Sequence, residues 1–285
     1  MRDDFAVFVL SHGRANKMKT VETMKEAGYT GKLYIICDNE DKELDDYIKN
    51  FGKERVIIFD KKEKAKEVDT MDSIEKRNVV VFARNTVFDI AEKLGLTYFL
   101  ELDDDYELFR YRYVDKNGKF TSTVVHNFDQ LVDLMLEFLE ETNATSVAFG
   151  QTGDMIGGEK SQLYQIKIKR KVMNTFFCKV DRRFDFIGRL NEDTTTYTYL
   201  GSQGKLFMTI ADITLEQVET QYNKGGLTDS YLENGTYVKS FYSVMCMPSC
   251  VKVDMMISNH PRIHHLLDYN KAFPKIISDR FKKSV

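Results

Sequence analysis

The sequence is poor in the features that divide a chain into loosely joined parts. Its 285 residues include only three prolines, which leaves little room for a stiff or disordered linker, and we find no internal repeat or low-complexity segment. Hydrophobic residues make up 42% of the chain and charged residues 30%, as in ordinary globular proteins. We therefore expect a single folded domain over residues 1–285, with a sizeable core.

Long apolar runs are also lacking. The longest, such as residues 5–10 and 98–102, are far shorter than the roughly 20 residues that a membrane-spanning helix needs. The start, Met1-Arg2-Asp3-Asp4, has neither the basic head nor the long apolar core of a secretory signal. We expect no membrane span, a cytoplasmic location and no obligate protein partner.

Cysteine is scarce and scattered. Of the four cysteines, only Cys246 and Cys250 lie close together in the sequence, and no second pair is available to complete a structural zinc site. Cys37 and Cys178 stand alone in apolar segments. We interpret all four as reduced thiols in the core or in strands.

Charge is unevenly distributed, although the net charge is only −3. Residues 161–285 hold 18 Lys or Arg against 12 Asp or Glu, a surplus of about +6, so residues 1–160 carry about −9. The surplus is typical either of a surface that binds a polyanion or of an ordinary solvated face. The residues that form its three basic clusters are Lys167, Lys169, Arg170 and Lys171; Lys179, Arg182 and Arg183; and Lys271, Lys275, Arg280, Lys282 and Lys283.

In the first hundred residues, short apolar runs alternate with helix-like segments, a pattern typical of βα units that build a parallel sheet. A helix over residues 15–27 is expected to end at Gly28, and a helix over residues 74–94 at Gly95, because glycine favours the left-handed residue that ends many helices. The expected strands cover residues 5–10, 33–37, 56–59 and 98–102.

Beyond residue 105 the pattern becomes antiparallel. Residues 106–114 and 119–125 flank an Asn-Gly turn and predict a hairpin, and residues 128–141 predict a helix capped by Asn127. The glycine-rich stretch 150–158 gives no clear prediction. The sequence therefore predicts an α/β fold with a nucleotide-binding half of about residues 1–125 and a more irregular half of about residues 126–285.

The strongest local signal is Leu100-Glu101-Leu102-Asp103-Asp104-Asp105, in which three aspartates follow an apolar strand. The carboxyl ends of parallel strands line the crevice in which open α/β sheets bind ligands. Alternate residues of a strand point the same way, so Asp103 and Asp105 can share one divalent cation, whose other ligands would be diphosphate oxygens and water. A solvated acidic turn is the plainer alternative, and the βα units before the acids favour the cation site.

This arrangement resembles the GT-A glycosyltransferases, in which such aspartates hold Mn²⁺ or Mg²⁺ on the diphosphate of a nucleotide sugar. The resemblance implies a Rossmann-like, mostly parallel central sheet flanked by helices, with a smaller antiparallel portion on the acceptor side. It also implies a UDP-sugar as the donor. The residues assigned to donor binding on this ground are Ser11, His12, Arg14, Asp38, Glu40, Arg77, Arg84, Asp103 and Asp104.

Arg77 and Arg84 enter this set because they are seven residues apart and share one face of the helix expected over residues 74–94. By resemblance, that face is turned toward the diphosphate or the base of the donor. Either arginine can instead belong to a surface ion pair, an alternative that the sequence leaves open.

A second acidic signal, Asn191-Glu192-Asp193-Thr194, lies in the second half. A neutral alcohol is a poor nucleophile, so its attack on a sugar needs a carboxylate within hydrogen-bonding reach. Many inverting GT-A enzymes carry an acidic pair after the metal site, and by this resemblance Asp193 is the expected catalytic base, with Glu192 as the alternative. A simple helix cap explains the same four residues equally well.

Three of the five histidines fall within residues 259–265. Some GT-A enzymes add a histidine from near the C-terminus to the carboxylates around the metal, and a neutral imidazole suits that role. His260 or His264 is the expected ligand, and the sequence does not choose between them. Histidines that are merely packed or exposed are the alternative.

Four motifs together resemble one narrower group, the TET-associated glycosyltransferases of bacteriophages, which are related to the base J glucosyltransferases. They are Ser11-His12-Gly13-Arg14, Phe82-Ala83-Arg84-Asn85, the strand that ends in the three aspartates, and Arg189-Leu190-Asn191-Glu192-Asp193-Thr194 followed by Gly201. The resemblance covers about residues 5–265. It implies transfer of a hexose to the hydroxyl of 5-hydroxymethylcytosine or 5-hydroxymethyluracil in DNA, with the basic clusters contacting phosphates.

Three other functions stay open at this point. A GT-A enzyme with a glycan, protein or small-molecule acceptor would keep the fold and the donor site. A non-catalytic DNA-binding protein on a transferase fold would not need the acids at residues 103–105 or those at residues 192–193 to be intact. A nucleotidyltransferase would also use a nucleotide, a metal and paired aspartates, but would release pyrophosphate.

Overall fold

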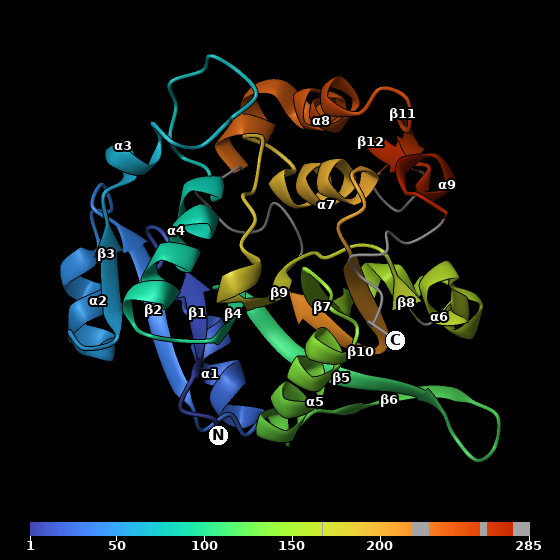
Figure 1. The fold of residues 1–285 in the computed structure, drawn as a ribbon, viewed down its shortest axis with the longest axis horizontal. Helices are drawn as coiled ribbons and strands as arrows, with labels where there is room; N and C mark the ends of the chain where they lie inside the picture. The colour runs from blue at the N-terminus through green and yellow to red at the C-terminus, as the bar shows by residue number, and fades with distance from the viewer. Residues whose placement is uncertain (167, 218–227, 257–260, 276–285) are drawn as a thin grey trace.

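The computed structural model describes residues 1–166, 168–217, 228–256 and 261–275 (Figure 1). In this part of the chain, ten strands form one sheet in the order β3-β2-β1-β4-β9-β7-β10-β5-β6, with β8 paired to β10. The strands are β1 (Phe5–Leu10), β2 (Lys32–Asp38), β3 (Val56–Phe59), β4 (Tyr98–Asp103), β5 (Tyr106–Val114), β6 (Phe120–Val124), β7 (Ser146–Gln151), β8 (Ile168–Lys169), β9 (Thr175–Lys179) and β10 (Phe207–Gln217).

The sheet is parallel over its first four strands and mixed beyond them. β1 pairs with β2 and β4, and β2 with β3, all in parallel, as expected for successive βα units. β9 and β5 run in the opposite direction, while β7, β10 and β6 share the direction of β4. This confirms the predicted α/β fold, with its parallel half and its antiparallel additions.

Helices cover both faces of the sheet and the edge at which the parallel strands end. They are α1 (Lys19–Glu26), α2 (Leu44–Phe51), α3 (Lys61–Lys64), α4 (Val81–Lys93), α5 (Phe128–Glu141), α6 (Gln162–Ile166), α7 (Glu192–Ser202), α8 (Thr228–Cys246) and α9 (Tyr269–Ala272), with 3₁₀ turns η1 (Thr152–Met155), η2 (Gly158–Lys160) and η3 (Val180–Arg182). α8 packs against α7 and against the hairpin of β11 (Val251–Met256) and β12 (Arg262–Leu267) (Figure 1).

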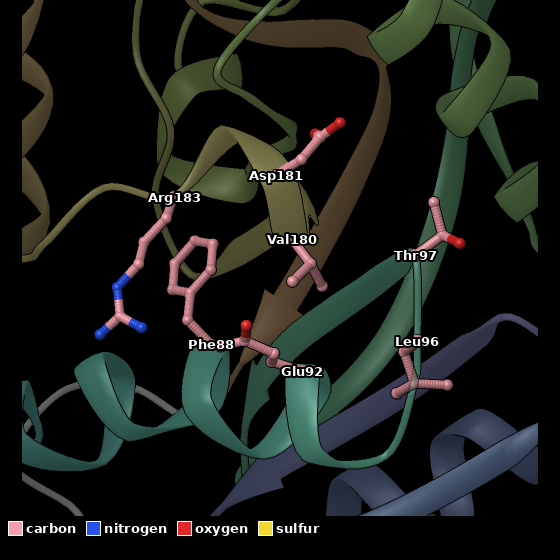
Figure 2. A pocket seen from close by; sticks show the side chains of 7 residues that line it. All are labelled: Phe88, Glu92, Leu96, Thr97, Val180, Asp181 and Arg183. Atoms are coloured by element: carbon pink, nitrogen blue, oxygen red, sulfur yellow. The ribbon is translucent and has the colours of Figure 1, made fainter.

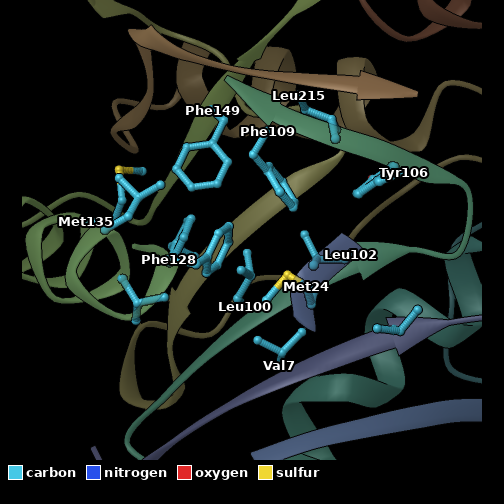
Figure 3. Packing of buried hydrophobic residues seen from close by; sticks show 14 of the residues in the cluster. Val7, Met24, Leu100, Leu102, Tyr106, Phe109, Phe128, Met135, Phe149 and Leu215 are labelled. Carbon is cyan, nitrogen blue, oxygen red and sulfur yellow. The ribbon is translucent and has the colours of Figure 1, made fainter. Parts of the chain in front are cut away.

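Two hydrophobic clusters lie on opposite faces of the sheet. On one face, Phe128 of α5 packs against Phe109 of β5 and Phe149 of β7, with ring centroids of the three side chains 4.8–6.1 Å apart (Figure 3). On the other face, Phe88 of α4 packs against Phe99 of β4 at 4.9 Å. β4 is therefore buried on both sides, which explains its nearly continuous apolar sequence.

Most of the predicted elements are confirmed, and some of their boundaries move. β1, β3, β5 and α5 have the predicted bounds, and Gly28 and Gly95 follow α1 and α4 with positive φ. α1 begins at Lys19 instead of residue 15, and α2 was not predicted at all. The unassigned stretch 150–158 forms the end of β7, η1 and the start of η2.

The largest correction concerns the helix expected over residues 74–94. α4 begins only at Val81, because the segment before it is held by other partners: Arg189 donates to the carbonyl oxygens of Ile74 and Lys76, and to Asp72 at 2.8 Å. Arg77 therefore does not share a helical face with Arg84. Asn127 precedes α5 at the cap position, but its side chain makes no cap bond and accepts from Tyr111 at 2.9 Å instead.

Among the described residues, no helix is both long and apolar enough to cross a membrane.

Candidate active site

The three aspartates lie at the rim of the sheet, where β4 ends, and the central one is the most enclosed. Asp104 is buried, and its carboxylate accepts from Ser11 Oγ at 2.5 Å and from Arg14 Nη1 at 2.7 Å. Burial raises the pKa of Asp104, and the charge of Arg14 opposes that rise. Tyr47 completes the contact, because its hydroxyl lies 2.7 Å from Ser11 Oγ and accepts from the Arg14 amide at 2.9 Å. Asp104 therefore fastens the loop after β1 to the end of β4.

Two further donor-site candidates meet beside this loop, at the end of β2. His12 Nδ1 lies 2.7 Å from Asp38 Oδ2, and the same oxygen accepts from buried Lys61 at 3.0 Å. The hydrogen bond to Asp38 raises the pKa of His12. Burial acts to raise the pKa of Asp38, but contact with His12 and Lys61 outweighs burial, and the pKa of Asp38 is lowered. With 46% of its side chain exposed, His12 presents a ring that readily takes a positive charge at the rim.

Glu40 and Arg77, also assigned to donor binding, pair with each other. Arg77 Nη2 lies 2.6 Å from Glu40 Oε1, and about a third of each side chain is exposed. Arg77 thus approaches the rim from the loop before α4, and that loop is held in place by Arg189. Arg77 therefore reaches Glu40, which follows β2, by a route that the sequence did not indicate.

The centre of the site is a buried arginine that contacts three carboxylates. Arg84, on α4, donates from Nη1 to Glu101 at 2.6 Å, from Nε to Glu192 at 2.9 Å and from Nη2 to Asp103 at 3.3 Å. Only 3% of its side chain is exposed, and its guanidinium lies over the ring of Phe176 at 4.8 Å. One side chain therefore joins β4 to the first residue of α7, which brings the two acidic signals of the sequence together.

This cluster holds three carboxyl groups and one guanidinium. Burial raises the pKa of Glu101 to about 7, although Arg84 opposes the rise and Asp103 and Glu192 add to it. Burial also raises the pKa of Glu192, again against the effect of Arg84. Arg84 is thus buried and bound to carboxylates within the protein, and its predicted role of facing the donor stays a prediction.

Asp103 and Asp105 remain the candidates for holding a cation. Asp103 Oδ1 is buried without a hydrogen bond in the described structure and lies 3.1 Å from Arg84 Nη2, while 29% of the side chain is exposed; Asp105 is half-buried. Within the residues described, no three His, Cys, Asp or Glu side chains converge as a complete metal site. The pair fits a cation that takes its other ligands from a bound phosphate and water.

Of the two predicted histidine ligands, only His264 belongs to the described part of the chain. His264 lies on β12 opposite Asp254, where burial and the charges of Arg262 and Lys239 lower its pKa. His260 falls outside the described residues.

Asp193 and Glu192 open α7 and differ sharply in environment. Glu192 is buried in its contact with Arg84, whereas Asp193 is half-buried and its Oδ1 accepts from the Thr194 amide at 2.6 Å. Asn191, at φ 52°, turns the chain into the helix, and its amide donates to the Lys239 carbonyl at 2.6 Å. The start of α7 is therefore fixed from two sides, with Asp193 as its more accessible carboxylate.

Sequence reasoning assigned no role to three residues that hold this site together: Tyr47, and Glu101 and Arg189, which stand within the motifs named above. Glu101 carried a usable signal, because a single acid in an otherwise apolar strand needs a buried partner. Tyr47 and Arg189 had no such signal, since their partners are 36 and 117 residues away in the sequence.

The basic clusters are largely used in internal contacts. Lys171 is buried on Asp154 at 2.6 Å, Arg182 binds Glu140 at 2.6 Å, and Arg183 pairs with Asp89. Lys167, Arg280, Lys282 and Lys283 lie outside the described residues. In the described part, the cluster at residues 179–183 therefore behaves as a set of structural ion pairs.

A cavity of about 460 Å³ lies beside that second cluster (Figure 2). Thr97, Val180 and Arg183 are among its lining residues, which come from the start of β4, the end of β9 and α4. β4 runs from this cavity to the aspartates, so the cavity lies at the opposite end of the strand from the candidate site.

Comparison with known proteins identifies one family. A family model described as TET-Associated Glycosyltransferase matches residues 5–226, which is 222 of the 285 residues. No curated protein sequence matches the chain significantly.

Solved structures with a similar chain course are remote in sequence. A mannosyltransferase from Pyrobaculum calidifontis in complex with GDP-Man and Mn²⁺ is 11% identical, with a TM-score of 0.49 over 87% of this chain and 73% of that chain. Glucosyl-3-phosphoglycerate synthase from Mycobacterium tuberculosis, with Mn²⁺, UDP and phosphoglyceric acid, is 9% identical, with a TM-score of 0.47 over 92% and 86%. TarS from S. aureus is 10% identical, with a TM-score of 0.43 over 76% of this chain and 37% of TarS, so this chain spans about a third of the length of TarS. Similarity at this level does not establish a shared activity.

Proposed function

Because the chain belongs to the TET-Associated Glycosyltransferase family, we propose that it transfers a hexose from a UDP-sugar to the hydroxyl of a 5-hydroxymethylpyrimidine in DNA. The observation that carries the proposal is the joining of two acidic groups by Arg84. Asp103, at the rim of the sheet, and Glu192, which opens α7, both contact this one guanidinium. This contact supports a site in which the proposed donor and acceptor groups lie side by side.

The donor would bind on the β1–β2 side of the acids. His12 and Arg14 supply positive charge there, Asp103 and Asp105 would hold Mn²⁺ or Mg²⁺, and Ser11, Asp38 and Asp104 fix the loops that carry these groups. When bound, the ion would offset the charge that develops on the departing nucleoside diphosphate. His260 or His264 stays a proposed further ligand, without support from the described geometry.

Asp193 is the proposed base. It takes the proton of the hydroxymethyl group while that oxygen forms a bond to the anomeric carbon and the bond from this carbon to the phosphate oxygen breaks, leaving its electron pair on the nucleoside diphosphate. Attack from the side opposite the leaving group inverts the anomeric centre. Glu192 is less suited to this role, since it is buried and its carboxylate already binds Arg84.

Family membership is the support for DNA as the acceptor, and the distribution of charge adds little further support. The arginines at residues 182 and 183 are engaged in ion pairs with Glu140 and Asp89. This observation keeps a glycosyltransferase with a glycan, protein or small-molecule acceptor as the second candidate.

The test is a reaction with products that separate the candidates. The protein is incubated with Mn²⁺, a panel of nucleotide sugars and DNA that contains 5-hydroxymethylcytosine or 5-hydroxymethyluracil; the DNA is then digested and its nucleosides are weighed. A hexose-sized mass gain together with nucleoside diphosphate release supports the proposal. Pyrophosphate release would indicate a nucleotidyltransferase, and no mass gain with any donor would reject the DNA acceptor.

Matched variants test the base. Asp193→Asn should lower kcat by about 10²-fold or more, the usual contribution of a positioned general base. Asp181→Asn serves as the control, because its carboxylate is 67% exposed and lies at the opposite end of β4, beside the cavity. Equal activity of the two variants would show that Asp193 is not the base.

A further inference from the structure

Two carboxamide side chains lie beside the aspartates on the side away from the donor loops. β9 pairs antiparallel with β4 as far as Thr175 opposite Leu102, and Asn174 directly precedes β9 at the end of β4 that carries the aspartates. β10 ends with Gln217 opposite Tyr106, one residue after Asp105. Asn174 Nδ2 donates to Gln217 Oε1, which makes the two amides a pair.

The pair is held firmly yet reaches solvent. Asn174 has φ 62°, a left-handed conformation that asparagine adopts more readily than most residues. Buried Tyr106 donates its hydroxyl to the Asn174 carbonyl, and the Thr175 amide donates to the Met173 carbonyl at 2.7 Å. The Asn174 side chain is half-buried and that of Gln217 is exposed, so a ligand at the rim has access to both.

The order of the strands determines what such a ligand would be. The donor loops follow β1 and β2, the aspartates follow β4, and the amide pair lies on β9 and β10, on the far side of β4. A nucleotide sugar with its nucleoside near β1 and β2 and its diphosphate at Asp103 must extend its sugar past β4, over β9.

We propose that Asn174 and Gln217 bind hydroxyl groups of the transferred sugar and determine which hexose the enzyme accepts. This inference rests on the proposed function and adds a specificity site to it. A carboxamide offers two N–H donors and a carbonyl acceptor, and the bond within the pair uses one N–H of Asn174 and one lone pair of Gln217. Since a hydroxyl both donates and accepts, the pair matches a sugar edge and would discriminate against an epimer in which one hydroxyl is inverted.

The test compares donors in variants that keep the backbone. Asn174→Gly removes the carboxamide and retains the left-handed conformation, and Gln217→Met keeps the length of the side chain. For each variant, kcat/KM is measured with UDP-glucose, UDP-galactose and UDP-N-acetylglucosamine in Mn²⁺, and UDP binding is measured by calorimetry. We expect UDP affinity within about twofold of wild type and a loss of at least about tenfold in discrimination between the best donor and the others.

Asn143→Gly is the matched control, because Asn143 is also left-handed, at φ 52°, but follows α5 away from the rim. It should leave discrimination unchanged. Unchanged discrimination in both rim variants, or an increase only in the KM for the acceptor, would overturn the inference while leaving the proposed function intact. Failure of the wild-type protein to bind UDP or any of the three donors would overturn both.

Discussion

Replacing Arg84 with methionine should strongly destabilise the protein, because three carboxylates depend on this one cation. Met keeps an unbranched, flexible stem but has no guanidinium and no charge, so the variant leaves Glu101 and Glu192 buried without their partner. The side chains of Arg84, Glu101 and Glu192 are 3%, 1% and 7% exposed, and screening by solvent is therefore small. The contact with Asp103 adds less, since 29% of that side chain is exposed.

The expected loss follows from this burial. Removing one partner of a buried ion pair costs about 3–5 kcal/mol, a large part of the roughly 5–15 kcal/mol by which native proteins are stable. The double variant Arg84→Met/Glu101→Gln should regain part of the loss, because one of the uncompensated charges is then gone. Arg84→Lys should fall between wild type and Arg84→Met, since lysine keeps the charge but cannot reach three acceptors with one planar group.

Urea unfolding followed by circular dichroism measures these differences, through midpoints compared at a common slope. The free energy of unfolding should decrease in the order wild type, Arg84→Lys, Arg84→Met. A loss of less than about 1 kcal/mol in Arg84→Met would refute the reasoning, because the carboxylates would then be compensated by something other than Arg84.

Three further predictions concern the same rim. The pKa of Glu101 is raised from 4.5 to about 7, so between these pH values the folded protein binds one proton more than the unfolded chain. The free energy of unfolding should therefore fall by about 3 kcal/mol as pH rises from 4.5 through 7. Urea titrations at pH 5 and 8 measure this decrease, and Glu101→Gln should abolish it. Asp104→Asn should weaken UDP binding by about tenfold or more in calorimetry, because Arg14 and Ser11 lose a charged partner, and unchanged binding would show that Asp104 does not position the loop. Mn²⁺ alone should bind weakly, because Asp103 and Asp105 supply only part of its ligands, and UDP should increase the affinity for Mn²⁺ by at least about tenfold. Equal Mn²⁺ affinity with and without UDP would imply a further protein ligand.

The sequence predicted the parallel half of the fold well because its signals there are local. β1, β3 and the strand before the aspartates are short apolar runs, and glycines mark where α1 and α4 end. The start of α4 could not be predicted from such signals. Residues 74–80 have a helix-like composition, but Arg189 binds their carbonyl oxygens from a distant part of the chain, and this contact outweighs local preference.

The candidate site shows the same division. The position of Asp103, Asp104 and Asp105 follows from the sequence, because a strand of known direction ends at residue 103. Their different roles do not: Asp104 binds Ser11 and Arg14, whereas Asp103 keeps a buried oxygen that has no hydrogen bond to any described residue. β4 ends at Asp103 and Asp104 lies in the turn that follows, so the surroundings of each depend on which side chains pack there.

By itself, the sequence determined the class of fold, the strand that ends in acids and the existence of a second acidic pair, since each is encoded by a few adjacent residues. Only the tertiary structure decided that Arg84 joins these acids, that Glu192 is buried while Asp193 is accessible, and that the amide of Asn174 donates to that of Gln217. The partners in these contacts are between 19 and 108 residues apart, and the burial that sets their charge and accessibility arises only when the strands and helices pack together.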